Sequence, residues 1–124
     1  MYQRNIFQSF KLAFDGLLFM LRTERNMRIH SIIAIGVIID SILLNIAHIE
    51  LLFICFSIAL VFVAEAANTA FELLLDFIQG DKFHPNVKIL KDIAAGGVFI
   101  AAINAFVIGI IIFGPKLLKI AHRS

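Results

Sequence analysis

Apolar and polar positions divide the chain into four segments, and the first has the pattern of an amphipathic helix over about residues 6–22. Its apolar positions recur at helical spacing and form one stripe: Phe7, Phe10, Phe14, Leu17, Leu18 and Leu21. Polar side chains such as Lys11 and Asp15 fall on the other side. The spacing predicts a helix. Such a helix can lie in a membrane interface or pack on its own protein, and the pattern alone leaves both open.

Three longer apolar segments follow, over about residues 29–47, 50–78 and 87–114. A polar stretch, a short turn at residues 45–50 and a polar loop at residues 79–85 separate them. About 20 apolar residues are enough to cross a bilayer as a helix. The segments therefore predict three membrane-spanning helices, the last of which we expect to end at Pro115 and the basic tail.

Composition supports this assignment. The 124 residues are 60% hydrophobic and 16% charged, with a mean hydropathy of +0.94. Soluble domains are about half apolar and one quarter charged, and a small domain cannot hide so much apolar surface in one core. We expect one all-α integral membrane domain over residues 1–124. The net charge of +2, without basic residues interleaved with aromatics, argues against a nucleic-acid partner.

Basic residues predict the orientation of the spans. Eight of them precede the first span or lie around the loop between the second and third: Arg4, Lys11, Arg22, Arg25, Arg28, Lys82, Lys88 and Lys91. The turn between the first two spans has none. The bias of basic residues toward the cytoplasm places the N-terminus and the second loop on that side. The C-terminus then lies outside, although Lys116, Lys119 and Arg123 argue against this.

The second span carries polar side chains where apolar ones are expected. Glu65, Asn68, Glu72 and Asp76 share one helix face, within an arc of about 80° and along roughly 16 Å. We call these four residues the polar column. Charged groups inside a membrane helix are costly and usually mark a functional site. Three acids in one column repel one another unless a metal ion or a basic partner lies between them.

Basic partners occur in the neighbouring segments. Lys91 and Asp92 open the third span near the depth of Asp76, and Glu24 comes from the same side. Phosphoryl transfer requires carboxylates that hold magnesium and a lysine that neutralises phosphate charge. A further carboxylate can take the proton from an attacking hydroxyl. ATP would arrive from the cytoplasm and a lipid alcohol from the bilayer. The alternative is that the polar column is only a structural seam between helices.

These residues resemble a known family. The run from Glu65 through Asn68 to Glu72, then Asp76, then Lys91-Asp92-Ile-Ala-Ala-Gly-Gly, is similar to the signature of the bacterial integral-membrane diacylglycerol kinase and undecaprenol kinase family. Residues 23–30 resemble the juxtamembrane segment of its prenol-kinase branch. The resemblance implies a homotrimer of three-span subunits in the bacterial cytoplasmic membrane. It implies transfer of the γ-phosphate of MgATP to a lipid hydroxyl at a site on the cytoplasmic side.

The resemblance also implies roles for individual residues. Glu65 would be the catalytic general base, and Glu24 and Glu72 would be magnesium ligands. The remaining residues would bind or orient the nucleotide: Asn68, Asp76, Lys91 and Asp92. Neighbouring subunits could share these groups.

The acceptor and one alternative class of function stay open at this point. The juxtamembrane segment at residues 23–30 favours undecaprenol as the acceptor. The alternative acceptor is diacylglycerol, whose phosphorylation would give phosphatidic acid. A non-enzymatic membrane subunit or a cation carrier could use the same acids. A carrier needs polar groups through the full depth of the bilayer, whereas residues 105–113 are wholly apolar. The four histidines, His30 among them, show no ligand spacing, and we expect them to be interfacial or solvated.

Overall fold

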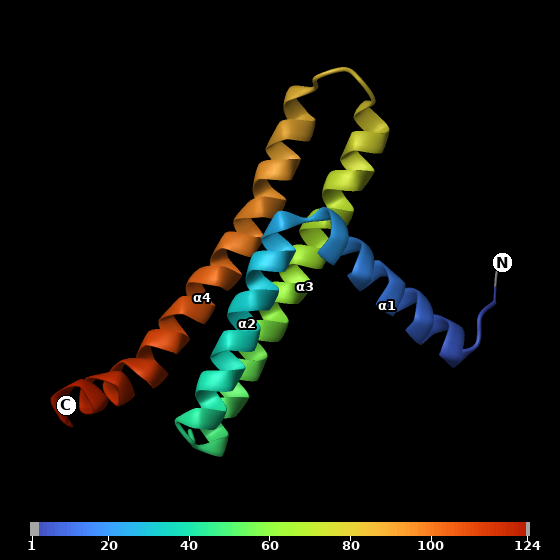
Figure 1. Cartoon of the computed structure of the whole chain (residues 1–124). Coiled ribbons are helices and arrows are strands. Elements are labelled where there is room, and N and C mark those ends of the chain that lie inside the picture. The colour runs from blue at the N-terminus through green and yellow to red at the C-terminus, as the bar shows by residue number, and fades with distance from the viewer. Residues whose placement is uncertain (1–2, 124) are drawn as a thin grey trace.

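The chain is all-helical in a computed structural model that describes residues 3–123 (Figure 1). Its helices are α1 (Ile6–Thr23), α2 (Arg25–Leu43), α3 (His48–Gln79) and α4 (Pro85–Arg123). The last three are long and apolar enough to cross a membrane. The prediction of an all-α chain with three potential spans is confirmed.

Helix α3 is the centre of the arrangement. Helices α3 and α4 form a long antiparallel pair, and α2 packs on α3, whereas α2 and α4 do not contact each other within the described residues. The upper parts of α3 and α4 extend beyond the start of α2 (Figure 1). The end of the molecule that carries the α3–α4 turn is therefore built from two helices only.

The junction between α1 and α2 is held by Arg28. Helix α1 ends because Glu24 is extended, with φ −106° and ψ 113°. Arg28 Nη1 donates to the carbonyl oxygens of Leu21 and Arg22, each at 3.0 Å. The last carbonyls of a helix have no partner within it, so this side chain caps α1. The guanidinium thus fixes where α1 leaves the bundle.

The two remaining turns use residues that tolerate a positive φ. Asn45 has φ 51° after α2, and the N–H of Ile46 reaches the carbonyl of Ser41 at 3.3 Å, as in a Schellman C-cap. Gly80 has φ 64° after α3, where a side chain would be strained. Pro85 then begins α4 at a position where its missing N–H costs nothing.

Two helices have bounds that differ from those of the expected spans. Helix α2 occupies Arg25–Leu43 rather than about residues 29–47, because the turn at Asn45 ends it early. Helix α4 continues through Pro115 to Arg123, beyond the residue at which we expect the third span to end. Proline removes one backbone hydrogen bond and bends a helix, but the preceding turns can carry the helix through it.

Most apolar surface faces outward. In the stripe of α1, Phe7 is 81% exposed, and only Met20 is buried in that helix. The phenylalanines of the stripe are therefore exposed in the single chain, whereas Leu18 and Leu21, near the junction with α2, are half-buried. Between 11% and 22% of the residues in the most apolar windows of α2, α3 and α4 are buried. Water cannot cover so much exposed apolar surface without large cost, so lipid or further copies of the chain must cover it.

Candidate active site

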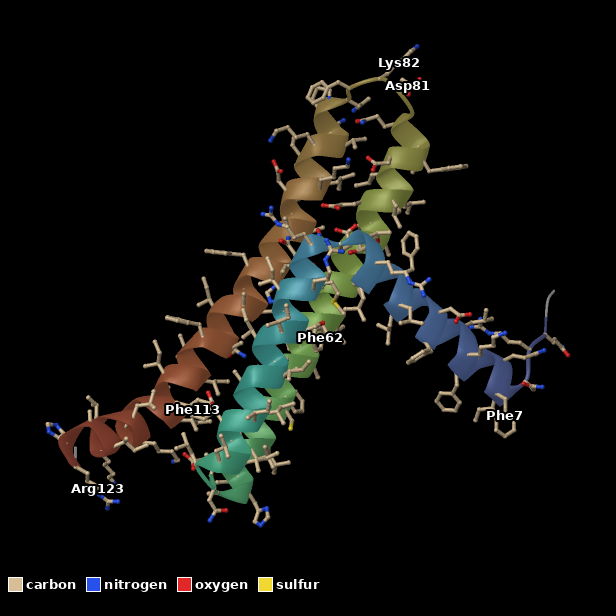
Figure 2. All side chains as sticks on the ribbon, viewed as in Figure 1. Phe7, Phe62, Asp81, Lys82, Phe113 and Arg123 are labelled. Carbon is tan, nitrogen blue, oxygen red and sulfur yellow. The ribbon has the colours of Figure 1, made fainter. Side chains whose placement is uncertain are left out.

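The polar column of α3 runs from a buried to an exposed environment. Glu65 is 2% exposed, Asn68 and Glu72 are half-buried, and Asp76 is exposed. Glu65 lies where α2 packs on α3, and the column then follows α3 toward the α3–α4 turn. Nitrogen and oxygen atoms gather between the upper parts of α3 and α4 in Figure 2, above the α1–α2 junction. The column therefore joins the apolar part of the bundle to its polar end.

Glu65 meets a histidine of α2. His30 Nε2 lies 3.0 Å from Glu65 Oε1, which is the distance of an ion pair when the imidazole is protonated. The His30 side chain is 24% exposed, and that of Glu65 is 3% exposed. A buried carboxylate is costly without a polar or charged neighbour. His30 supplies that neighbour from a different helix.

Two buried oxygens of the column lack hydrogen bonds. Glu65 Oε1 and Asn68 Oδ1 are buried without a hydrogen-bond partner among the described residues, so the contact with His30 is close but not well aligned. Asn68 Nδ2 is 3.5 Å from Glu72 Oε1, which is a long contact. Buried acceptors are normally satisfied in folded proteins. Their state here fits a site that completes its contacts when ligands bind.

The exposed end of the column carries two ion pairs. Lys91 of α4 donates to Asp76 of α3 and thus links the two helices. Lys88 Nζ lies 2.7 Å from Asp92 Oδ2 one turn away on α4, and both side chains are largely exposed. Exposed pairs of this kind contribute little to stability, from about 0 to 1 kcal/mol. Replacing either ion pair by a contact with a ligand would therefore change the free energy of unfolding only slightly.

The structure brings some predicted site residues together and leaves others apart. Asp76 meets Lys91, and Glu65 shares its face with Asn68 and Glu72. Asp92 pairs with Lys88 rather than with the column. Glu24 lies at the α1–α2 junction, half-buried, and no three acidic, histidine or cysteine side chains of residues 3–123 come close enough to form a metal site. Magnesium ligation by Glu24 and Glu72 stays a prediction.

An apolar groove reaches the buried end of the column. It has a volume of about 440 Å³ and lies between α2 and α4 on α3. Its lining includes Val37, Val61, Ala102 and Gly109, and it extends to His30, the neighbour of Glu65. A hydrocarbon chain in this groove would have one end near the Glu65 carboxylate.

The comparison with known sequences covers most of the chain. The family profile described as prokaryotic diacylglycerol kinase covers residues 11–113. The chain belongs to the prokaryotic diacylglycerol kinase family. The resemblance inferred from the polar column and Lys91-Asp92 is thereby confirmed.

Two relatives bear the names of the two acceptors considered above. The chain is 41% identical over 111 residues to an undecaprenol kinase of Bacillus subtilis, covering 90% of this chain and 89% of the relative. It is 36% identical over 116 residues to a diacylglycerol kinase of Synechocystis, covering 94% of this chain and 66% of that relative. It thus spans nearly all of one relative and just under two thirds of the other. The names of the family and of both relatives indicate a lipid kinase, which is a phosphotransferase.

Sequence reasoning missed one residue of the candidate site. His30 was expected to be interfacial or solvated, yet it is the close neighbour of Glu65. Its partner lies 35 positions away along the chain, so no local spacing could indicate the contact. The available signal was that His30 and Glu65 fall at similar depths of two adjacent spans.

A stability measurement separates a kinase site from a structural seam. Glu65→Gln keeps the shape of the side chain and removes a buried charge whose Oε1 accepts no hydrogen bond. We expect the free energy of unfolding in detergent to stay the same or to rise by up to about 1 kcal/mol, because functional groups are commonly held at a cost to stability. The measurement is the thermal midpoint, with Glu72→Gln as the half-buried control. A loss of several kcal/mol would show that Glu65 acts as a structural group.

Proposed function

We propose that this protein is a kinase of the bacterial cytoplasmic membrane that transfers the γ-phosphate of MgATP to the hydroxyl of undecaprenol. The observation that carries the proposal is the position of Glu65. An apolar groove extends to His30, the neighbour of this buried carboxylate, and the polar column leads from Glu65 in the other direction to Asp76 and its partner Lys91. The identity of 41% with an undecaprenol kinase over most of both chains supports the choice of acceptor.

The acceptor alcohol belongs at the buried end. Its chain would lie in the groove, whose lining is almost entirely apolar, with the hydroxyl near Glu65. Glu65 would take the hydroxyl proton as the oxygen attacks the phosphorus atom. His30 would hold the Glu65 carboxylate in place from α2. The apolar surroundings would keep water from competing with the alcohol as the attacking group.

The nucleotide belongs at the exposed end. Lys91 would leave its ion pair with Asp76 and bind the ATP phosphates instead. Asn68 and Asp92 would orient the nucleotide. Glu72 and Glu24 have the hard oxygen ligands that Mg²⁺ prefers, and this ion is often held by one or two carboxylates together with phosphate oxygens. The unpaired Asn68 Oδ1 between Glu65 and Glu72 fits such a set of oxygen ligands. Bound magnesium would neutralise the charge that develops on the transferred phosphoryl group.

The proposal extends to location and assembly. Helix α1 would lie in the membrane interface, because its phenylalanine stripe is exposed and its other side is polar. The polar column would face the cytoplasm, where ATP is present. A homotrimer would cover much of the exposed apolar surface. A neighbouring copy could also bring further ligands to the carboxylates of one chain.

Diacylglycerol is the second candidate acceptor. The relative that favours it is the Synechocystis diacylglycerol kinase, at 36% identity. Apolar grooves discriminate weakly between long chains, since one methylene group changes binding by only about 1–3 kcal/mol. A panel of prenols and diacylglycerols with labelled ATP and purified protein decides between the two acceptors.

Loss of activity in Glu65→Gln is the first functional prediction. The wild type should phosphorylate undecaprenol, and the variant should lose a factor of about 100 to 10,000 in kcat, because an amide cannot accept the proton. The assay measures phosphate transfer from labelled ATP in detergent micelles. Glu50→Gln is the matched control, since Glu50 lies at the other end of α3, and it should keep full activity. Full activity of Glu65→Gln would rule out this carboxylate as the base.

His30 should act by positioning Glu65. His30→Ala should lower kcat by about 10- to 100-fold through loss of alignment, while the KM for ATP stays unchanged. His30→Gln keeps a side-chain N–H and should recover much of the activity. His48→Ala, at the α2–α3 turn, is the control. Equal damage from the alanine and glutamine variants would contradict this role.

Gly109→Leu should obstruct the groove. A Cβ atom at Gly109 meets nothing within 4 Å, so a larger side chain can enter the groove without a clash. We expect the KM for undecaprenol to rise severalfold and the KM for ATP to stay constant. Gly36→Leu is the matched control, because Gly36 is an open glycine of α2 outside the groove. If both variants had the same KM for undecaprenol, the hydrocarbon chain of the lipid would not bind in this groove.

A further inference from the structure

The last part of α4 has a different character from the rest of the helix. After Pro115, the basic side chains Lys116, Lys119, His122 and Arg123 fall within an arc of about 120°. Leu117, Leu118, Ile120 and Ala121 fill the opposite arc of about 160°. Residues 116–123, which we call the tail helix, contain no acidic side chain. This arrangement is that of a basic amphipathic helix.

An ion pair fixes the level at which the tail helix begins. Lys116 Nζ lies 3.1 Å and 3.2 Å from the two carboxylate oxygens of Glu50, in the first turn of α3. Residues 93–115 carry no charge, and as a helix they would span about 35 Å, close to the thickness of a hydrocarbon core. Lys116 therefore marks the membrane surface at the end opposite the exposed part of the polar column.

The tail helix bends where it reaches this surface. Pro115 has no N–H to donate to the carbonyl of Ile111, which weakens the helix at this point. Figure 1 shows the red end of α4 turned away from the axis of the preceding turns. Leu117, Leu118 and Ile120 are each more than half exposed. Exposure of these apolar side chains to water would be unfavourable, whereas a helix along the membrane surface can insert them into the lipid.

We propose that the tail helix lies in the membrane interface at this end and binds the phosphate groups of anionic phospholipids. Lys116 is already paired with Glu50, whereas Lys119 and Arg123 have no ion pair among residues 3–123. Their charge is complementary to anionic headgroups, and their helix presents its apolar face to the acyl chains. The basic residues of this surface lie at the end of the bundle opposite the exposed part of the polar column, although Leu117 also lines the apolar groove. It also accounts for basic residues on the side where the cytoplasmic bias predicts few.

Fluorescent labels on opposite faces of the tail helix test its placement. Cys55 is replaced by serine, and one cysteine is introduced at Leu118 or at His122 of the full chain. Each variant carries an environment-sensitive dye, in vesicles of phosphatidylcholine alone or of phosphatidylcholine and phosphatidylglycerol in equal parts. Nitroxide-labelled lipids should quench the dye at position 118 more than the dye at 122, and phosphatidylglycerol should increase quenching at 118. Equal quenching at both positions would overturn the interfacial placement.

Charge variants test the proposed ligand. Adding Lys119→Gln and Arg123→Gln should abolish the increase in quenching that phosphatidylglycerol causes at position 118. The reason is that each basic residue changes the affinity for an anionic surface by about fivefold. Lys11→Gln with Lys82→Gln removes the same charge from exposed residues elsewhere and should leave the increase intact. The proposed headgroup site is wrong if the control substitutions abolish the increase in quenching equally. It is also wrong if phosphatidylglycerol does not change quenching at position 118 in either set of variants.

Discussion

The burial of the Glu65 carboxylate is the constraint on which the arrangement of this kinase depends. A nearly inaccessible acid in an apolar bundle requires a polar neighbour, and the neighbour here is His30 of α2, at 3.0 Å. The pair therefore couples the register of α2 on α3 to the position of the proposed base. Within residues 3–123, Glu65 Oε1 and Asn68 Oδ1 accept no hydrogen bond, although His30 lies beside Glu65. Both atoms are therefore free to accept a hydrogen bond from a substrate in the proposed mechanism.

The lengths of the helices place the two ends of the polar column in different surroundings. Helices α3 and α4 extend beyond α2, so Asp76 and Lys91 stand where a water-soluble nucleotide can reach them, while Glu65 stays among apolar side chains. The groove lies on α3 between α2 and α4, whose backbones do not approach each other closely within the described residues. Two substrates of opposite solubility can thus approach one row of side chains from its two ends. In the proposed mechanism, the two substrates would therefore be separated by their depth in the membrane.

Features that depend on one helix were predictable from the sequence. The 3.6-residue period placed Glu65, Asn68, Glu72 and Asp76 on one face, and apolar length identified α2, α3 and α4 as spans. The column and Lys91-Asp92 were also distinctive enough to indicate the family, which the comparison confirmed.

Features that depend on two helices were not predictable in this way. The contacts of His30 with Glu65 and of Glu50 with Lys116 join residues far apart along the chain, and only the packing of the spans brings them together. The course of α4 through Pro115 was missed because proline disfavours a helix interior without excluding it. No three acidic, histidine or cysteine side chains of residues 3–123 form a metal cluster, so a role of Glu24 as a magnesium ligand stays a prediction.

The central claim is that nucleotide binds at one end of the bundle only, and bound Mn²⁺–ATP tests it most directly. In a protein with Cys55 replaced by serine, a spin label is attached at Lys82→Cys, in the α3–α4 turn, or at Asn45→Cys, in the α2–α3 turn. The paramagnetic metal should strongly broaden the spectrum of the label at position 82 and leave the label at position 45 unchanged. Equal broadening at both positions, or broadening at position 45 alone, would contradict a nucleotide site at the Asp76–Lys91 end.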